Sequence, residues 1–186
     1  MAKKQQAEDA VKTLITWAGE DLEREGLAGT PKRVAEAYQE FFIGYTQDPH
    51  EILSQSFSEV EGYQNMVLVE NIAFYSHCEH HMIPFFGTAS IAYLPNQRIV
   101  GFSRLIRVLE VYSRRLQVQE RLTEQIAQVI QDVLQPKGVA VLLQAEHLCM
   151  SMRGLRQSGV QVKTHSFCGT FTEPEQQERF FRMLSQ

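Results

Sequence analysis

The densest group of metal-binding side chains in the sequence is His77-Cys78-Glu79-His80-His81. Cys78 and His81 have the C-x-x-H spacing, which allows one turn to present both side chains to the same ion. His147 and Cys149 form a second pair, two residues apart on a predicted strand. Because alternate residues of a strand share a face, we expect these two side chains to point to the same, buried side.

Cys78, His81 and Cys149 together provide three ligands for a zinc ion. Three protein ligands leave the fourth position of zinc open to water, which is typical of a catalytic rather than a structural site. Zinc lowers the pKa of such a water to about 7 and so makes hydroxide available. His80 and His147 then remain for proton transfer, because histidine titrates close to neutral pH.

Other interpretations of these residues stay open. A closed structural zinc site would use Cys78, His81, His147 and Cys149 together, and it would suit a non-enzymatic scaffold. Alternatively, Cys149 would be a core thiol and His147 a hydrogen-bonded core histidine. The H-x-E at residues 77–79 is similar to half of the zinc-deaminase signature, but the P-C-x-x-C half is absent from the sequence.

Positive charge gathers in two segments of a chain whose formal net charge is -4. Residues 101–121 hold five arginines and two glutamates. Arg104 and Arg107 share a helical face in the first turns of a predicted helix, where the helix dipole also favours anions. Arg153 lies in a second segment, residues 151–163, that contains no acidic residue. The two segments predict a polyphosphate site near the metal, although a solvated basic face is the alternative for any single arginine.

Gln119-Glu120 lies at the predicted start of a helix, where the helix N-terminus keeps a carboxylate ionised. Such a carboxylate is able to accept two hydrogen bonds from the N1–H and 2-amino groups of guanine. An ordinary acidic residue of a first helical turn fits the same position, so position alone favours no special role.

The composition is that of a packed globular protein, with 44% hydrophobic and 22% charged residues. The net negative charge argues against a nucleic-acid binder held by diffuse basicity. No apolar segment follows Lys3-Lys4 and no run is long enough to cross a bilayer, so we expect no signal peptide, no membrane contact and a cytoplasmic location. Three cysteines do not favour a disulfide framework, and Cys168 is expected to pack as a small hydrophobe. His77 and His165 receive no role.

The pattern of elements predicts an α+β fold. Helix formers extend over residues 6–24, and Thr30-Pro31 opens a second helix. From about residue 65 the order is ββααββ, with the third strand over residues 139–150 and Ser103 as the cap of the first of the two helices. Consecutive strand pairs favour an antiparallel four-stranded sheet with two helices on one face. We therefore expect an N-terminal helical region over residues 1–60 and a catalytic domain over residues 61–186, with open sheet edges that favour assembly.

Several ordered motifs carry a family resemblance. Cys78-Glu79-His80-His81, Gly101-Phe102-Ser103-Arg104, Gln117-Val118-Gln119-Glu120-Arg121-Leu122 and His147-Leu148-Cys149-Met150 resemble motifs of GTP cyclohydrolase I, as does Thr30-Pro31-x-Arg33 near the N-terminus. The resemblance covers about residues 10–184. It implies that GTP and water give 7,8-dihydroneopterin triphosphate and formate, the first step of pterin and tetrahydrofolate synthesis.

The resemblance also implies roles for individual residues. Cys78, His81 and Cys149 would bind zinc, and His80 and His147 would be the acid/base pair for water addition at C8 of the purine. His147 would protonate the imidazole nitrogen of the purine. The implied substrate contacts are Gln119 and Glu120 with guanine, and Ser103, Arg104, Arg107, Arg153 and Arg33 with the ribose and phosphates, with Arg33 from a neighbouring subunit.

The family fold is the tunnelling fold, in which two pentameric rings form a homodecamer with active sites at subunit interfaces. Two positions depart from the family pattern. Arg104 stands where a lysine is common, which keeps the charge but changes its reach, and Glu36 stands where some members have a lysine near the triphosphate. A related tunnelling-fold enzyme acting on another purine or pterin is less favoured, because such relatives lack the combined cysteine and histidine motifs. Allosteric regulation and the downstream pathway do not follow from the sequence.

Overall fold

The computed structural model describes residues 3–57 and 63–184. These residues form two compact units, one up to Ile43 and the other from Gly44 onward. The predicted boundary between residues 60 and 61 lies outside the described residues, so it stays a prediction.

The first unit is a pair of helices, α1 (Lys4–Trp17) and α2 (Thr30–Phe41). The prediction that the first helix continues to residue 24 is wrong, because the chain turns at Gly19, whose φ of 95° suits glycine and ends a helix. An ion pair of 2.8 Å between Lys4 and Glu36 joins the two helices. A short 3₁₀ helix, η1 (Ile43–Thr46), follows α2.

The second unit is built on a sheet with the strand order β3-β1-β2-β4-β5. Its four long strands pair antiparallel and are β1 (Val67–Cys78), β2 (Pro84–Leu94), β4 (Gly138–His147) and β5 (Val162–Gly169). The predicted four-stranded antiparallel sheet is confirmed. The two-residue strand β3 (Leu116–Gln117) adds a parallel pairing with the Cys78 end of β1 that the sequence did not predict.

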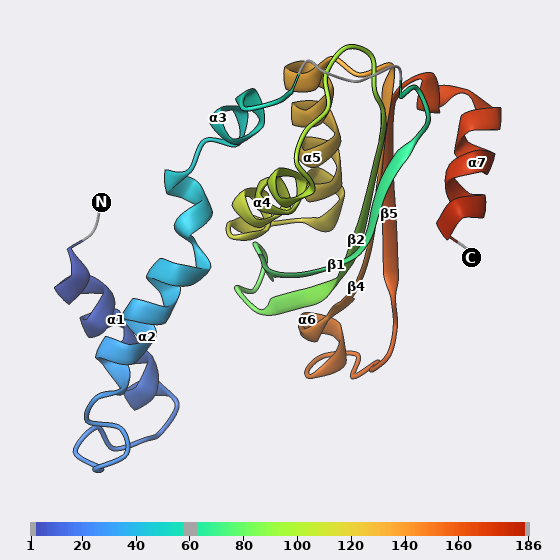
Figure 1. Ribbon diagram of the computed structural model, residues 1–186. Coiled ribbons are helices and arrows are strands. Elements are labelled where there is room, and N and C mark those ends of the chain that lie inside the picture. Colours follow the sequence, from blue (N-terminus) through green and yellow to red (C-terminus); the bar gives the residue numbers. More distant parts are fainter. Residues whose placement is uncertain (1–2, 58–62, 185–186) are drawn as a thin grey trace. The chain divides into compact units, whose positions relative to one another are not determined.

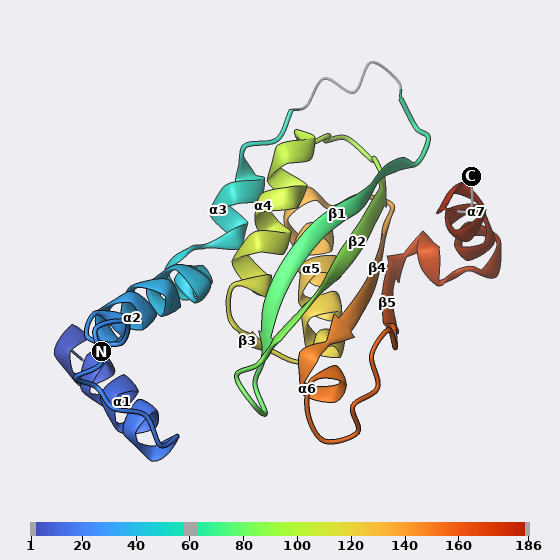
Figure 2. The ribbon, with the colours of Figure 1, turned by 90° about the horizontal axis from the view of Figure 1, so that it is seen from below.

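Helices lie on both faces of this sheet (Figures 1 and 2). α4 (Phe102–Ser113) and α5 (Gln119–Leu134) cover one face, as predicted, and α3 (Pro49–Ser54) packs beside them. Their apolar sides enclose the main core with the sheet. On the other face, η2 (Thr170–Thr172) and α7 (Pro174–Leu184) place Phe171 and Phe180 in a second, smaller core.

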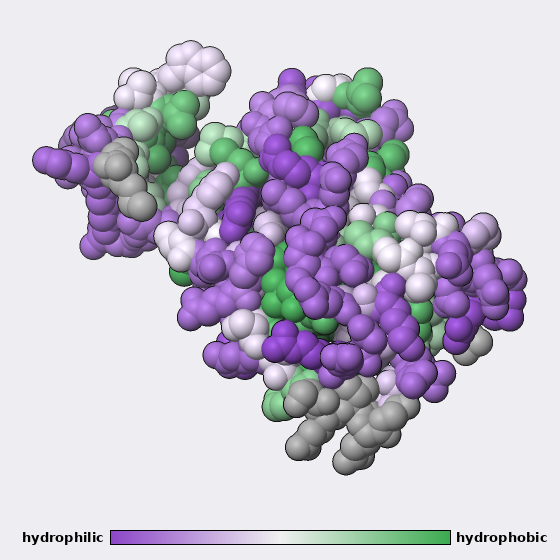
Figure 3. All heavy atoms as spheres, turned by 90° about the horizontal axis from the view of Figure 1, so that it is seen from above, coloured by the Kyte–Doolittle hydropathy of each residue, from purple (hydrophilic) through white to green (hydrophobic). Residues whose placement is uncertain are grey.

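The outer surface agrees with the composition. Hydrophilic residues cover most of the face seen in Figure 3, and hydrophobic residues form smaller groups among them. Among the described residues, no helix is both long enough and apolar enough to cross a membrane.

The predicted third strand, over residues 139–150, is wrong in its last residues. β4 ends at His147, and the chain turns into the short helix α6 (Leu148–Ser151), which carries Cys149. His147 pairs with Phe85, and the next residue of β2 is Pro84, which has no N–H to extend the ladder. His147 and Cys149 therefore do not share a strand face. Likewise Ser103 is not the cap of α4, because the cap is Gly101, two residues earlier, and Ser103 lies in the first turn of the helix.

Candidate active site

Cys78, His81 and Cys149 lie together although β1, a turn and α6 supply them. Their ligand atoms are all within 4.8 Å of one another, and Cys78 Sγ is 3.8 Å from His81 Nδ1. Two ligands of a tetrahedral zinc ion, bound at about 2.0–2.3 Å, stand about 3.5–3.8 Å apart. The donor atoms and their spacing therefore fit a zinc-type ion.

The turn that follows β1 presents the first two of these side chains. The Met82 N–H donates a hydrogen bond of 2.8 Å to the Cys78 carbonyl, which closes the turn. The Glu79 N–H donates one of 3.0 Å to the Gln117 carbonyl, which ties the turn to β3. The prediction that one turn presents Cys78 and His81 to a common point is confirmed by this geometry.

The Cys149 thiol lies close to a second thiol and to the positive charge of Arg153. Burial raises the pKa of Cys149, and the neighbouring Cys78 raises it further, while the charge of Arg153 lowers it. Two adjacent thiolates repel each other, and a bound metal ion would offset that repulsion. Arg153, just beyond α6, is close enough to contribute positive charge at this place.

The three metal-type residues line a cavity of about 250 Å³. The predicted proton-transfer residues His80 and His147 line the same cavity, and so do Gln119 and Glu120 at the first turn of α5. The structure thus brings seven of the twelve predicted site residues to one place.

The side chain of Gln119 is used inside the protein. It is only 1% exposed, and its Nε2 donates hydrogen bonds to the Leu143 carbonyl (3.3 Å), the Val162 carbonyl (3.0 Å) and Thr164 Oγ1 (3.1 Å). Its Oε1 lies 2.8 Å from His147 Nε2. Both N–H groups of this amide are used inside the protein, which leaves none of them for the predicted guanine contact.

The His147 ring is held from a second side by Phe85. The two rings stack with centroids 4.5 Å apart and planes inclined by 2°. Burial lowers the pKa of His147, while the nearby Glu120 carboxylate raises it. A lowered pKa keeps the imidazole neutral near pH 7 and able to accept a proton.

Three residues of the predicted phosphate site, Ser103, Arg104 and Arg107, do not line this cavity. They lie in the first turns of α4, which begins at the far end of the sheet from β3 and α6 (Figure 2). Arg104 donates a hydrogen bond of 2.8 Å to the Ile52 carbonyl and another to the Gln55 side chain.

Arg107 has an acidic environment of its own. It lines a cavity of about 360 Å³ together with Asp48, Glu51 and Glu110. In the first unit, Arg33 donates hydrogen bonds to the Gly26 carbonyl (3.2 Å) and to Thr30 Oγ1 (2.9 Å).

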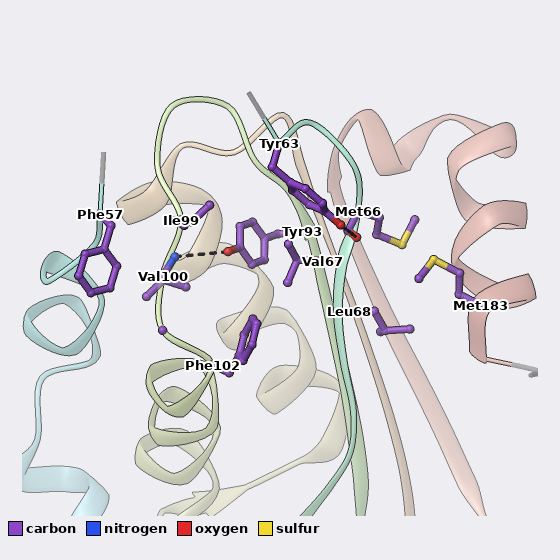
Figure 4. A pocket seen from close by; sticks show the side chains of 11 residues that line it. Phe57, Tyr63, Met66, Val67, Leu68, Tyr93, Ile99, Val100, Phe102 and Met183 are labelled. Carbon is purple, nitrogen blue, oxygen red and sulfur yellow. Dashed lines mark hydrogen bonds between the residues drawn. The ribbon is translucent and has the colours of Figure 1, made fainter. Parts of the chain in front are cut away.

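A larger cavity, of about 570 Å³, lies near the start of α4 (Figure 4). Its lining is mostly apolar, with Phe102 and Met66 among the side chains drawn, and none of the predicted site residues contributes to it. Inside it the Val100 N–H donates a hydrogen bond of 3.3 Å to the Tyr93 hydroxyl. A choice of site by cavity volume alone would therefore miss the metal-type and proton-transfer residues, which line the smaller cavity.

Sequence reasoning missed two supports of the site. Phe85 was not singled out, because only the strand register places it against His147. Arg121 was not given a role beside the metal, yet it pairs with Glu79 in the metal-binding turn and donates a hydrogen bond of 3.1 Å to Gln117 Oε1. The sequence contained one sign of this ion pair, because the Glu79 carboxylate lies between two predicted site residues, Cys78 and His80.

Comparisons with known proteins agree on one family. The family model described as GTP cyclohydrolase I matches residues 7–185. Proteins named GTP cyclohydrolase 1 from Brucella suis and Brucella melitensis are 54% identical to this chain over 182 residues, which is 97% of this chain and 85% of theirs.

A solved structure shows a more distant likeness. The apo form of the archaeosine synthase QueF-Like is 16% identical, with a TM-score of 0.48, and the match covers 57% of this chain and 96% of that one.

Proposed function

The chain belongs to the GTP cyclohydrolase I family, so its activity is that of a GTP cyclohydrolase, and we propose that the imidazole ring of GTP is opened in the 250 Å³ cavity. The reaction converts GTP and water to 7,8-dihydroneopterin triphosphate and formate. The observation that carries this placement is that the Cys-His-Cys group, His80 and His147 line one cavity. The expected cytoplasmic location stays a prediction.

Cys78, His81 and Cys149 are the residues that would hold zinc. Two thiolates and one imidazole suit zinc, and the 3.8 Å between Cys78 Sγ and His81 Nδ1 is close to the spacing of two zinc ligands. When bound, zinc would supply water activated near neutral pH. His147 is not part of the group and its Nε2 already bonds to Gln119, which favours the open three-ligand site over the closed four-ligand one.

His80 and His147 would move the protons that ring opening requires. When water adds at C8 of the purine, the imidazole nitrogen must gain a proton and the water must lose one. His147 would give the first of these protons, and His80 would complete the acid/base pair. Both residues line the cavity, and the rings of His80 and His81 are 6.3 Å apart, so His80 lies next to the metal group.

The first turn of α5 would recognise the guanine edge. Glu120 is exposed at the cavity and would accept hydrogen bonds from the N1–H and 2-amino groups. Gln119 is the first residue of α5, so its main-chain N–H has no partner within the helix and would donate to the guanine carbonyl oxygen.

Replacing Glu120 with glutamine is expected to raise KM for GTP by about 10- to 100-fold, because a charged acceptor of two hydrogen bonds is lost. The preference of the wild type for GTP over inosine triphosphate, which lacks the 2-amino group, should shrink in the same variant. Steady-state kinetics with both nucleotides measure these changes. Glu124→Gln, one turn further along α5, is the matched control, and equal KM values for the two variants would contradict the assignment.

The triphosphate would be bound with the help of a neighbouring subunit. The cavity is small for a whole nucleotide, since ligand pockets usually enclose about 300–1,000 Å³. Val67 pairs with Tyr93 near the end of β2 that leads to α4, whereas His77 pairs with Pro84 at the metal end. The ten strand residues between these two ends span about 33 Å. Arg104, in the first turn of α4, therefore lies at the opposite end of the sheet from the metal-group cavity of its own chain. This separation supports a triphosphate site shared between subunits, as the proposed homodecamer would provide.

Mixed assemblies test the shared site. Homo-oligomers of His147→Ala and of Arg107→Ala should each have little activity. Assemblies formed from equal amounts of both should recover up to about a quarter of wild-type turnover, because that fraction of randomly formed interfaces pairs an intact His147 with an intact Arg107. Co-expression with two affinity tags provides the mixed sample. Activity no higher than the mean of the two parents would show that one chain supplies both residues.

A further inference from the structure

We propose that Gln119 is a positioning residue that holds His147 as the tautomer with the proton on Nε2 and leaves Nδ1 to exchange a proton with the substrate. The inference rests on the proposed role of His147 in the reaction. In this proposal the Gln119 side chain binds the acid/base residue His147 and does not contact the guanine.

The surroundings of Gln119 determine which way its amide faces. The Leu143 and Val162 carbonyl oxygens lie 3.3 and 3.0 Å from Nε2, and a carbonyl oxygen only accepts hydrogen bonds. The reversed amide would set Oε1 against both oxygens at a buried position, where an unpaired and repelled acceptor is costly. Oε1 therefore faces His147, and because this oxygen only accepts, His147 Nε2 must carry the proton.

Two threonines fix the same direction independently. Thr123 Oγ1 donates its single proton to the Gln119 carbonyl at 2.7 Å. The hydroxyl of Thr164, 2.7 Å from Thr123 Oγ1, must then donate to Thr123. Thr164 Oγ1 is left as an acceptor, and the group 3.1 Å away is Gln119 Nε2. Each hydroxyl proton of the two threonines thus has one place, and the two protons of Gln119 Nε2 are shared among three acceptors, Leu143 O, Val162 O and Thr164 Oγ1.

The ring of His147 is fixed in plane as well as in protonation. Phe85, which is fully buried, stacks on it and is its cross-strand partner. Phe85 thus fixes the plane of the ring, and Gln119 accepts the hydrogen bond of Nε2–H. The other ring nitrogen, Nδ1, has no hydrogen-bond partner among the described residues. A neutral ring in this tautomer accepts a proton at Nδ1, and the protonated ring returns it from the same atom.

The tautomer can be measured directly in the metal-loaded protein without GTP, so the result does not depend on turnover. Solid-state NMR of protein labelled with 15N-histidine, at a pH where the ring is neutral, separates the two nitrogens, and the signals missing from His147→Ala identify the residue. We expect a protonated Nε2 and a bare Nδ1. A protonated Nδ1, or a mixture of both tautomers, overturns the proposal.

Kinetics of Gln119→Met test the consequence for the reaction. We expect kcat to fall about 10- to 100-fold with KM for GTP changed less than about threefold, the size of effect seen when a residue that orients a functional histidine is lost. In a His147→Ala background the same substitution should cause no further fall. Gln125→Met is the matched control, since it removes a partly buried glutamine of α5 whose side chain bonds only to Gln117 among the described residues.

Two outcomes overturn the proposal. An equal loss of kcat in both backgrounds would mean that Gln119 acts on the structure and not through His147. A rise in KM with unchanged kcat would mean that its side chain binds the guanine. Failure of the proposed function looks different, because wild-type protein would then release no formate or His147→Ala would keep full turnover.

Discussion

Replacing His147 with alanine is expected to lower kcat for GTP by about 10²- to 10⁴-fold while the bound metal stays at the wild-type level. The side chain lines the cavity but is not one of the Cys-His-Cys group, and its Nε2 is engaged by Gln119. The substitution thus removes a proton donor and acceptor without removing a metal ligand. Metal analysis of the purified protein and single-turnover kinetics measure the two quantities separately.

A second histidine provides the control for that experiment. His165 lies on β5, is exposed, and lies outside the cavity of the metal group. His165→Ala should therefore keep both metal and turnover. Loss of metal from His147→Ala would instead support the closed four-ligand zinc site and a structural role for the ion.

Replacing Cys149 with serine is expected to reduce the bound zinc to a small fraction of one ion per chain and to abolish turnover. A serine hydroxyl does not ionise near neutral pH, so one of two thiolate ligands is lost. The protein should still fold, because Cys149 is only partly buried and lies on the one-turn helix α6. Metal content, circular dichroism and formate release measure the three expectations.

Cys168→Ala is the matched control for Cys149→Ser. Cys168, like Cys149, is a partly buried free thiol that packs against the main core, but it lies on β5 and is not part of the metal group. Burial raises the pKa of Cys168, as expected for a thiol that acts as a small hydrophobe. Full zinc binding by Cys149→Ser, or equal loss of zinc from both variants, would contradict the ligand assignment.

Local patterns in the sequence predict much of this fold and of the metal group. The apolar spacing of α5 and the Pro136 that follows it place that helix to within a residue or two. The C-x-x-H spacing predicts the turn that presents Cys78 and His81, since such a turn needs only local hydrogen bonds. These features depend on neighbouring residues and are therefore visible in the order of the residues.

Features set by strand register could not be predicted in this way. Phe85 meets His147 only because β2 and β4 pair in one register, and Pro84 then ends the ladder and allows α6 to form. The buried amide of Gln119 reaches β4 and β5 from α5, a contact between segments far apart in the sequence. A glutamine at a helix start therefore suggested a ligand contact where the structure shows internal hydrogen bonds.

The distribution of the arginines shows a further limit. Sequence spacing placed Arg104, Arg107 and Arg153 in one polyphosphate site, but only Arg153 lies near the metal group of its own chain. Arg104 instead binds the Ile52 carbonyl, and Arg107 lines a separate cavity. Charge patterns along one chain do not tell which subunit contributes each charge to a shared site.

The most direct test of the proposed site and its reaction is to incubate the zinc-loaded protein with GTP and to measure formate together with the pterin formed. We expect one formate for each GTP consumed and, after oxidation, a fluorescent pterin that still carries the triphosphate. Both products should disappear in His147→Ala with zinc still bound. Unchanged GTP, or release of phosphate without formate, would contradict the proposed function.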